Sequence, residues 1–433
     1  MHATTITHVC RPRFLAAILG STATRVLAAA ASFGLNLLLA RLLGAQGYGT
    51  YAFVISCVLL AATCGKWGWD KAAVRFVAQY RANGDQQRLA DFMRASRRAV
   101  LVLGIVFGAL CGGWIALGSS PMIPGTVLAA ALLVPLSSLG CLLQGQLRGA
   151  TRVVASEVPE GVLKPLATAG VTLALLTLFG TLDPVFVAVF GSLCAAVLAN
   201  VVASLLLMRS LPFGMPELRS AHAHQWTRDV REYGVLGIAQ VALARSPIVL
   251  AGLVLDPAGV GLVAVAARLG DVVAFAVTSV GLAAAPRMAA LYHLGDMQEC
   301  RRLLTLATRY SAAAGAAICA VMALGGSYFL RLFGEDFTAA HPVLLAMCAA
   351  QFVAACCGPV GYLASMSGHQ RQAAAIQLIS AAIGALATVV LGKLWGFVGV
   401  GVAIAVSVAG ANLLLQRLSA HILPKASEPE RPQ

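Results

Sequence analysis

A short sequence pattern near the start of the chain returns about half a chain later. The segment Leu38 to Val54 reads LLARLLGAQGYGTYAFV, and the segment Leu253 to Ala266 reads LVLDPAGVGLVAVA. An offset of 212 residues carries Gly49 of the first segment onto Gly261 of the second. Each copy has an apolar run, a short break and a G-x-G sequence that opens the next apolar run. This order predicts a membrane helix, a tight outer turn and a returning helix.

Two further echoes indicate that the chain is duplicated. At the same offset, the segment 73–85, AVRFVAQYRANGD, matches the segment 285–296, APRMAALYHLGD. The second segment has one residue fewer before its Gly-Asp pair. Gly149-x-x-Arg152 matches Gly368-x-x-Arg371 at an offset of 219, as expected if loops differ in length between two copies. The three echoes occur in the same order, so the sequence predicts two copies of one structural unit.

The composition tells what kind of unit is repeated. The chain has 433 residues, of which 59% are hydrophobic and 11% charged, with a mean hydropathy of +0.83. A soluble domain carries about 25% charged residues, so this chain is predicted to be a polytopic membrane protein. Its basic residues lie between apolar runs, as in loops retained in the cytoplasm. The net charge of +14 therefore gives no reason to predict nucleic-acid binding.

The apolar runs predict an all-α protein with twelve membrane spans. A basic amphipathic helix at the membrane surface, Lys66 to Arg98, is expected between the second and third spans. The domains are predicted as an N-terminal tail (1–13), a six-helix lobe (14–208), a linker (209–232), a second six-helix lobe (233–417) and a tail (418–433). The spans are predicted at 14–43, 48–65, 99–118, 124–147, 162–182, 184–208, 233–255, 258–284, 305–330, 341–366, 373–392 and 396–416.

Arginines are distributed unevenly between the two sides of these spans. The links after odd-numbered spans hold Arg41, Arg331 and Lys393. Those after even-numbered spans hold Arg75, Arg88, Arg97, Arg98, Arg148, Arg152, Arg219, Arg228, Arg287, Arg301, Arg302 and Arg371, among others. Both termini are therefore predicted to be cytoplasmic. Because each half has an even number of spans, the copies enter the membrane in the same direction, which predicts a parallel repeat.

Several of these segments resemble one transporter family. The ARLLGAQGYGTYAF turn, the GWDKAAVRFVAQY segment, the Gly149-x-x-Arg152 link and the DPAGVGL turn are similar to those of polysaccharide or oligosaccharide flippases of the multidrug/oligosaccharidyl-lipid/polysaccharide (MOP) exporter superfamily. The resemblance covers residues 14 to 417. It implies two six-helix lobes around a central cavity, alternating access, and transfer of an undecaprenyl-diphosphate-linked oligosaccharide across the inner membrane for synthesis of a surface lipopolysaccharide or exopolysaccharide. A polysaccharide polymerase and glycosyltransferases are the partners it implies, besides membrane lipids.

Charged residues inside the spans mark the candidate site, because an ionised group at mid-bilayer is costly and persists where it faces a cavity or a partner. Arg25 lies in the first span, Arg245 in the seventh, and Arg268 with Asp271 in the eighth. The first and seventh spans are equivalent in the two copies, so Arg25 and Arg245 are candidates to face each other. A guanidinium group can bind two diphosphate oxygens at once. The three arginines are thus the predicted substrate-binding residues.

Arg268 with Asp271, and also Arg245, have a structural alternative. Arg268 and Asp271 are spaced i, i+3 and can neutralise each other, or Asp271 can serve ion coupling. Arg245 precedes Ser246-Pro247 and can bond a carbonyl that the proline frees.

A second set of charges lies at the cytoplasmic end of the second span. Lys66, Asp70 and Arg75 are a candidate cytoplasmic gate, or else a solvated helix end.

Three functions remain open from the sequence. A flippase is favoured over a cation-coupled multidrug exporter of the same fold. Such an exporter is expected to have several intramembrane carboxylates for binding cations, whereas only Asp271 is available in the predicted spans. A membrane-embedded polymerase is expected to present a large outer loop with catalytic groups, whereas the outer links are short. We therefore predict that the chain is not an enzyme and has no cofactor. The eleven cysteines form no C-x-x-C pair, so no metal site is predicted.

Overall fold

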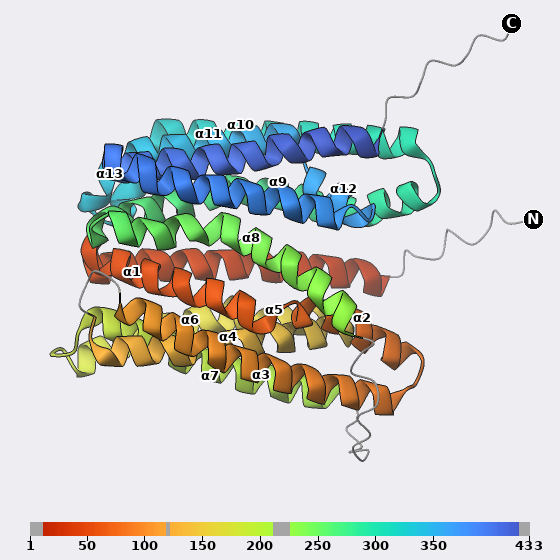
Figure 1. Cartoon of the computed structure of the whole chain (residues 1–433), viewed down its shortest axis with the longest axis horizontal. Coiled ribbons are helices and arrows are strands. Elements are labelled where there is room, and N and C mark those ends of the chain that lie inside the picture. Colours follow the sequence, from red (N-terminus) through yellow and green to blue (C-terminus); the bar gives the residue numbers. More distant parts are fainter. Residues whose placement is uncertain (1–11, 118–121, 211–225, 424–433) are drawn as a thin grey trace, which may run out of the picture. The chain divides into compact units, whose positions relative to one another are not determined.

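The computed structural model describes residues 12–117, 122–210 and 226–423, and for 12–22 the backbone alone. Most of the predicted tails (1–13 and 418–433) and of the predicted linker (209–232) lies outside the described residues. Within the described ranges every element is helical. The predicted all-α membrane fold is therefore confirmed (Figure 1).

The elements follow the apolar runs of the sequence. In the first half they are α1 (Pro12–Lys66), α2 (Trp69–Ala82), α3 (Gln86–Ala116), α4 (Pro124–Gly149), α5 (Val153–Glu157), the π-helix η1 (Val158–Leu163), α6 (Lys164–Leu178) and α7 (Pro184–Ser210). In the second half they are α8 (Thr227–Val254), α9 (Pro257–His293), α10 (Met297–Phe333), the 3-10 helix η3 (Glu335–Ala340), α11 (His341–Cys357), α12 (Val360–Met366) and α13 (Gln370–Ile422).

Two of these helices each contain two membrane spans. The described residues hold 10 helices long and apolar enough to cross a membrane. α1 and α13, with 55 and 53 residues, are interrupted by non-helical backbone at Gly44 (φ 65°) and Gly396 (φ 60°). Positive φ favours glycine because it has no Cβ. With each of the two helices divided in this way, the described residues accommodate the twelve predicted spans.

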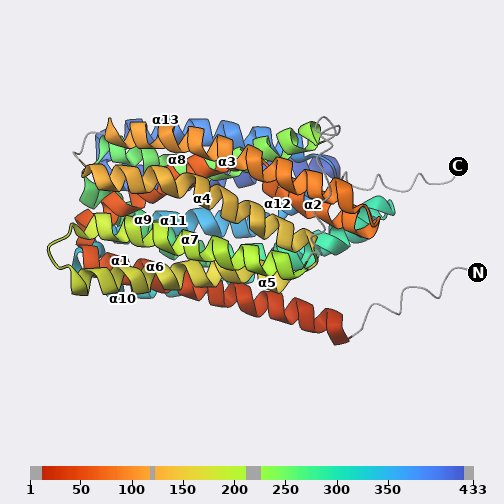
Figure 2. The ribbon, with the colours of Figure 1, turned by 90° about the horizontal axis from the view of Figure 1, so that it is seen from below.

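The chain divides into two compact units. The first contains residues 1–42 and 57–237, and the second contains residues 43–56 and 238–433. In the first unit α4 packs on α2, α3 and α7, and in the second unit α11 packs on α9, α10 and α13. Figures 1 and 2 show the long helices within each unit running side by side. Since α4 and α11 are the fourth and tenth spans, equivalent helices occupy the centre of both units.

The repeated Gly-Asp pair forms the same helix break in both copies. Gly84 (φ 68°) and Gly295 (φ 76°) are left-handed, and each ends a helix. Asp85 then accepts from the backbone N–H of Arg88 at 3.0 Å, while Asp296 accepts in the same way from residue 299 at 3.0 Å. An aspartate at this position satisfies one of the free N–H groups of a helix N-terminus. The duplicated sequence thus has a duplicated local structure.

Three predicted boundaries differ from the structure. The amphipathic segment predicted over 66–98 is two helices, α2 and α3, because the left-handed Gly84 separates them. The fifth span, predicted from residue 162, begins at Val153 and includes the π-helix. The tenth span, predicted as 341–366, is interrupted at Gly358 (φ 75°) before α12.

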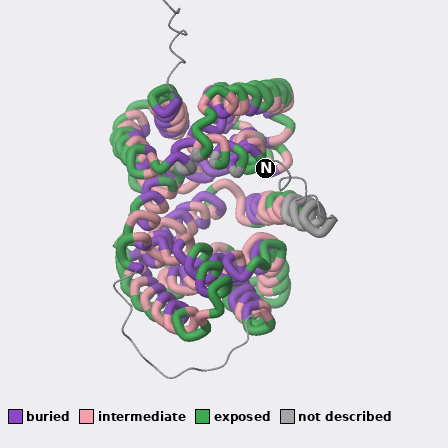
Figure 3. Tube along the Cα trace, turned by 90° about the vertical axis from the view of Figure 1, so that its right-hand side faces the viewer, coloured by how far each residue is buried: buried purple, intermediate pink, exposed green. Residues whose placement is uncertain are grey.

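Whether a residue is buried depends on the side of the helix on which it lies. In Figure 3 buried and exposed residues alternate along the helical tubes of each unit. Several exposed residues are large and apolar, including Ile105 and Leu110 on α3, Leu324 on α10 and Leu386 on α13. Apolar side chains exposed along membrane helices are suited to contact with lipid tails.

Candidate functional site

The second unit brings three predicted site residues together around a buried tyrosine. Arg245 lies on α8, while Arg268 and Asp271 lie on α9. Tyr48, in the part of α1 that belongs to this unit, has Arg268 as a side-chain hydrogen-bond partner. Arg245 lies within electrostatic range of Arg268, Asp271 and Tyr48. Among the described residues, the groups that act electrostatically on Arg245 are thus a second guanidinium, the Asp271 carboxylate and the Tyr48 hydroxyl.

The ion pair within this group is loose. Arg268 Nη1 and Asp271 Oδ2 are 3.5 Å apart, and the Asp271 side chain is 60% exposed. A pair of this length with an exposed partner is worth about 0–1 kcal/mol. Asp271 therefore holds Arg268 weakly. The group keeps a net positive charge that an anion can use.

The repeated G-x-G turns lie next to Tyr48 and bring α1 and α9 into close contact. A Cβ on Gly49 would lie 1.7 Å from the Pro257 carbonyl oxygen, and one on Gly261 would lie 2.3 Å from that of Ala45. The same added Cβ atoms would approach the backbone nitrogen of the other glycine at 2.7 and 3.2 Å. The equivalent glycines of the two copies thus meet each other, and no other residue fits either position.

The first unit holds Arg25 in an acid–base cluster that the sequence did not predict. Glu157 on α5 accepts from Arg148 Nη2 at 2.9 Å and from Gln144 Nε2 at 3.3 Å. Arg25 Nη2 lies 3.6 Å from Glu157 Oε1, the oxygen that Arg148 already contacts. Arg25 is thus the more weakly held of the two arginines on this carboxylate.

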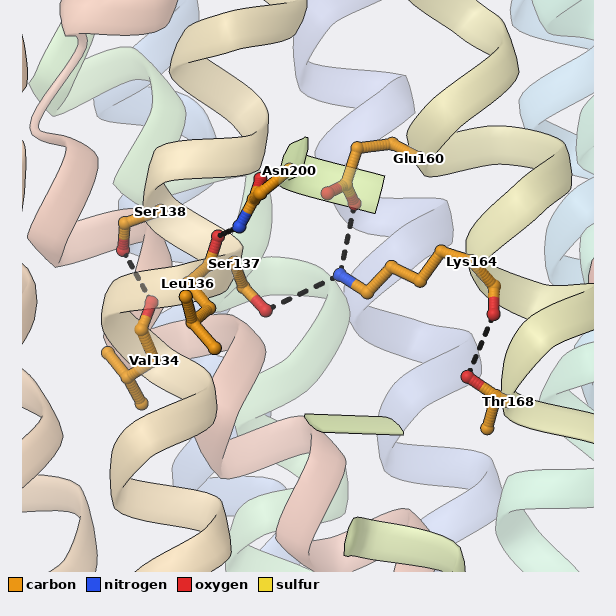
Figure 4. Close-up of polar contacts among 8 residues, drawn as sticks. All are labelled: Val134, Leu136, Ser137, Ser138, Glu160, Lys164, Thr168 and Asn200. Carbon is orange, nitrogen blue, oxygen red and sulfur yellow. Dashed lines mark hydrogen bonds and ion pairs between the residues drawn. The ribbon is translucent and has the colours of Figure 1, made fainter. Parts of the chain in front are cut away.

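A second acid–base pair follows one turn later (Figure 4). Glu160 Oε2 and Lys164 Nζ are 3.0 Å apart, with side chains 17% and 19% exposed. Lys164 also donates to Ser137 Oγ of α4 at 3.4 Å. The π-helix sets this geometry, because the Lys164 N–H reaches back to the Pro159 carbonyl instead of the carbonyl four residues before it. Short π-helical turns occur frequently at functional sites.

These carboxylates correct one premise of the sequence interpretation. Glu157 and Glu160 belong to the helical run Val153–Leu178, which is long and apolar enough to span a membrane. The statement that Asp271 is the available intramembrane carboxylate is therefore wrong. The uninterrupted apolar residues predict a fifth span that begins only at residue 162, and both acids then fall in the preceding link. The i, i+4 spacing of Glu160 and Lys164 was the signal that could have identified them.

The three residues of the predicted cytoplasmic gate each have an interaction within the first unit. Lys66 Nζ and Asp70 Oδ2 are 2.8 Å apart, with side chains 18% and 16% exposed, so this pair is not a solvated helix end. Arg75 Nη1 lies 2.8 Å from Asp229 Oδ2 at the start of α8. Burial lowers the pKa of Lys71 on α2, a shift that Asp70 opposes and Lys66 supports. Whether these pairs act as a gate remains a prediction.

The charged groups of the first unit form a connected network around one point of α4. Cys141 lies within electrostatic range of Lys66, Asp70, Glu160 and Lys164, and Lys66 lies within range of Arg148. No three histidine, cysteine or acidic residues with the geometry of a metal site gather in the part of the chain that the structure describes. The network is suited to proton or charge exchange, whereas the arginine pair of the second unit is suited to anion binding.

Comparisons with solved structures identify the fold. The chain is similar to the lipid II flippase MurJ in an inward closed conformation, with a TM-score of 0.74, 12% identity, and coverage of 94% of this chain and 87% of that one. It is also similar to an inward-facing multidrug resistance MATE family transporter of the MOP superfamily (TM-score 0.67, 13% identity, 93% and 96% covered).

A third similar structure is a MOP superfamily transporter from Pyrococcus furiosus, with a TM-score of 0.67, 14% identity, and 94% and 96% covered. Identities this low show the fold alone. The chain is therefore a multi-pass membrane protein with the fold of MOP transporters, as the sequence resemblance implied.

Sequence comparison supplies the family. No curated protein matches the chain. The family model described as "Polysaccharide biosynthesis protein" matches residues 15–292, which is more than half of the sequence. The chain therefore belongs to the polysaccharide biosynthesis protein family.

Proposed function

We propose that the chain is a flippase for a lipid-linked oligosaccharide carried on undecaprenyl diphosphate. It moves this substrate from the cytoplasmic to the periplasmic leaflet of the inner membrane during synthesis of a surface polysaccharide, and it acts as a transporter, not as an enzyme. Both termini are cytoplasmic in this proposal. The polymerase that uses the flipped units and the glycosyltransferases that build them are its proposed partners.

The observation that carries this proposal is the arginine pair of the second unit. Arg245 and Arg268 share one neighbourhood, and Asp271 beside them is exposed and loosely held. Two like charges inside a membrane protein repel each other unless an anion binds between or beside them. A diphosphate supplies two adjacent anionic groups, and each guanidinium can bind two oxygens.

Alternating access follows from the fold in this proposal. Two copies of a helical unit enter the membrane in the same direction and can open to either side in turn. Arg25 is a proposed third substrate contact, because its bond to Glu157 is long at 3.6 Å and its side chain is 36% exposed. Lys66, Asp70 and Arg75 are a proposed gate whose ion pairs break when the cytoplasmic side opens.

Deleting the gene and restoring it with variants tests the proposal. The deletion is expected to leave lipid-linked repeat units assembled and held in the inner leaflet, where an impermeant glycan-modifying reagent does not reach them. Arg245→Ala and Arg268→Ala should each fail to restore export at normal protein abundance, and lysine should restore it partly, since it lacks the planar fork. Arg302→Ala is the matched control, because Arg302 lies in the same unit with its side chain 76% exposed. Flipped but unpolymerised units in the deletion strain would support a polymerase.

A cation-coupled multidrug exporter is the second candidate, and one observation favours it. Glu157 and Glu160 supply the intramembrane carboxylates that such an exporter needs. Expression in a strain without its own efflux pumps distinguishes the two functions. Drug resistance that is lost in Glu160→Gln, together with normal export of glycan in the deletion strain, would favour the exporter.

A further inference from the structure

Three arginines gather on one side of α3 near its start. Arg94, Arg97 and Arg98 are spaced i, i+3 and i+4, so their side chains leave neighbouring positions on the helix surface. Arg94 Nη2 lies 2.8 Å from Asp91 Oδ1. Arg97 and Arg98 form no ion pair within the described part of the chain. We call the three residues the arginine cluster, and among the described residues its positive charge is neutralised only in part.

Arg97 extends the arginine cluster into the protein. Its side chain is half-buried, and its Nε atom is buried without a hydrogen-bond partner among the described residues. Like charges one turn apart destabilise a helix, and a partly buried charge is costly without a counter-charge. An anion at the exposed side of the cluster would reduce both costs.

An exposed apolar stripe continues from the arginine cluster along α3. Leu101, Val102 and Ile105 follow Arg98 by three, four and seven residues, and they are 39%, 61% and 62% exposed. These spacings place them on the face of the helix that carries Arg98, which is itself exposed. Exposed apolar side chains of a membrane helix contact lipid tails, and a long basic side chain at the end of the apolar run reaches the headgroups. The cluster and the stripe therefore match the two ends of a lipid molecule.

The second copy of the repeat lacks the arginine cluster. At an offset of 211, which aligns the two Gly-Asp breaks, Arg98 falls on Arg309 of α10, and the other two arginines fall on Thr305 and Thr308. Arg309 is exposed, as Arg98 is. The two threonines donate to carbonyl oxygens of their own helix at 2.9 and 2.8 Å. The equivalent helix thus forms without the cluster, which favours a ligand-binding role over a structural role for the arginines of the first copy.

We propose that the arginine cluster and the apolar stripe bind one anionic phospholipid. Arg97 and Arg98 donate to its phosphate oxygens, Arg94 adds positive charge beside them, and the acyl chains lie along the stripe. A choline or ethanolamine headgroup brings a further cation to a site that already has an excess of them, so an anionic headgroup is preferred. The lipid lies in the cytoplasmic leaflet, and this point alone rests on the proposed orientation of the chain.

A photoactivatable lipid tests this site. The full chain is placed in nanodiscs of phosphatidylcholine with a small fraction of phosphatidylglycerol that carries a diazirine near the glycerol end of one acyl chain. Light should attach this probe to the segment 101–105 of α3. Added phosphatidylglycerol should displace the probe, whereas the same amount of phosphatidylethanolamine should not. Changing Arg97 and Arg98 to glutamine should weaken binding about fivefold for each arginine removed.

Two variants control for charge and for folding. Arg309→Gln removes an exposed arginine from the equivalent position of the other copy, so attachment to the segment 101–105 should stay unchanged. Arg98→Gln alters an exposed side chain and should keep the unfolding temperature of the wild type while its binding falls about fivefold.

Three outcomes would overturn the inference. The first is equal attachment of the probe in the wild type and in the variant with both Arg97→Gln and Arg98→Gln. The second is equal displacement by phosphatidylglycerol and phosphatidylethanolamine. The third is displacement by farnesyl diphosphate at a lower concentration than by phosphatidylglycerol, which would assign the site to a lipid diphosphate. These readouts require no transport, so their failure leaves the proposed function to be tested by the gene deletion.

Discussion

Gly49 and Gly261 are residues at which a single added methyl group should destabilise the fold. A Cβ on Gly49 would lie 1.7 Å from a backbone oxygen, which cannot rotate away as a side chain can. Alanine gains about 1 kcal/mol of helix propensity over glycine, but overpacking costs about 1–3 kcal/mol or more. Gly49→Ala and Gly261→Ala should therefore lower the thermal unfolding temperature in detergent.

A matched glycine provides the control for this prediction. Gly410 lies within helix α13 of the same unit, and nothing lies within 4 Å of an added Cβ there. Gly410→Ala should leave the unfolding temperature unchanged or raise it slightly, measured by tryptophan fluorescence during heating. Equal stability of Gly49→Ala and Gly410→Ala would mean that the two helices do not meet at these glycines.

Substitutions of Arg268 and Asp271 test whether their ion pair is needed for the structure or whether Arg268 binds the substrate. With an exposed carboxylate at 3.5 Å, the pair contributes little to stability. Asp271→Ala should therefore keep normal protein abundance, whereas Arg268→Ala should lose export of the glycan. If the pair is instead structural, the double change Arg268→Ala with Asp271→Ala should be milder than either single change, because removing one partner strands the other charge. Full export by the double variant would remove Arg268 from the substrate site.

At the scale of elements, the π-helix Val158–Leu163 is the segment whose geometry matters most. Pro159 has no N–H and therefore cannot complete an α-helical turn here. Pro159→Ala restores that donor and should let the segment rewind as an α-helix, which turns Glu157 and Glu160 relative to Lys164. We expect loss of export at near-normal abundance, measured by restoring the deletion strain. Pro184→Ala is the control, because Pro184 is exposed at the first turn of α7.

The same segment shows what apolar patterning can and cannot predict. Helices such as α4 and α7 were predicted almost to the residue, because long apolar runs end at Pro, Gly or charge. The start of the fifth span was missed because Glu157 and Glu160 interrupt its apolar run. Their stability inside a helix depends on Arg148, Arg25 and Lys164, and the sequence does not show which distant residues will pair.

Arg25 illustrates the same limit within the candidate site. Its position inside an apolar run identified it as a residue that needs a partner or a cavity. No acid lies within one helical turn of it, so the pairing with Glu157 depends on how α1 packs near α5 and η1. By contrast, Arg268 and Asp271 are neighbours on one helix, and their contact could be predicted from spacing.

At the scale of the whole molecule, the two copies share a fold but differ in their charges. Both have the Gly-Asp helix break and a central helix, α4 or α11. The fifth span carries Glu157, Glu160 and Lys164, and Lys164 pairs with Glu160. The equivalent span is the first half of α13, which contains no acidic residue within the described range 370–396. The two copies therefore share a frame, whereas the acid–base pairs of the fifth span belong to the first copy.

The last prediction follows from the parallel repeat and concerns the orientation of the two copies in the membrane. In a chain whose eleven cysteines have been replaced, Gln87→Cys and Gln298→Cys introduce exposed thiols just after the two equivalent Gly-Asp breaks. Thr181→Cys and Asp256→Cys introduce exposed thiols between the fifth and sixth spans and between the seventh and eighth. The arginine asymmetry places the first pair in the cytoplasm and the second pair in the periplasm.

An impermeant maleimide applied to intact cells should therefore label positions 181 and 256, and label 87 and 298 only after the membrane is opened. The equivalence of the two copies requires positions 87 and 298 to behave alike, because an even number of spans separates them. If one of these two labels from outside and the other from inside, the copies enter the membrane in opposite directions. The repeat would then be inverted, and the assignment of both termini to the cytoplasm would be wrong.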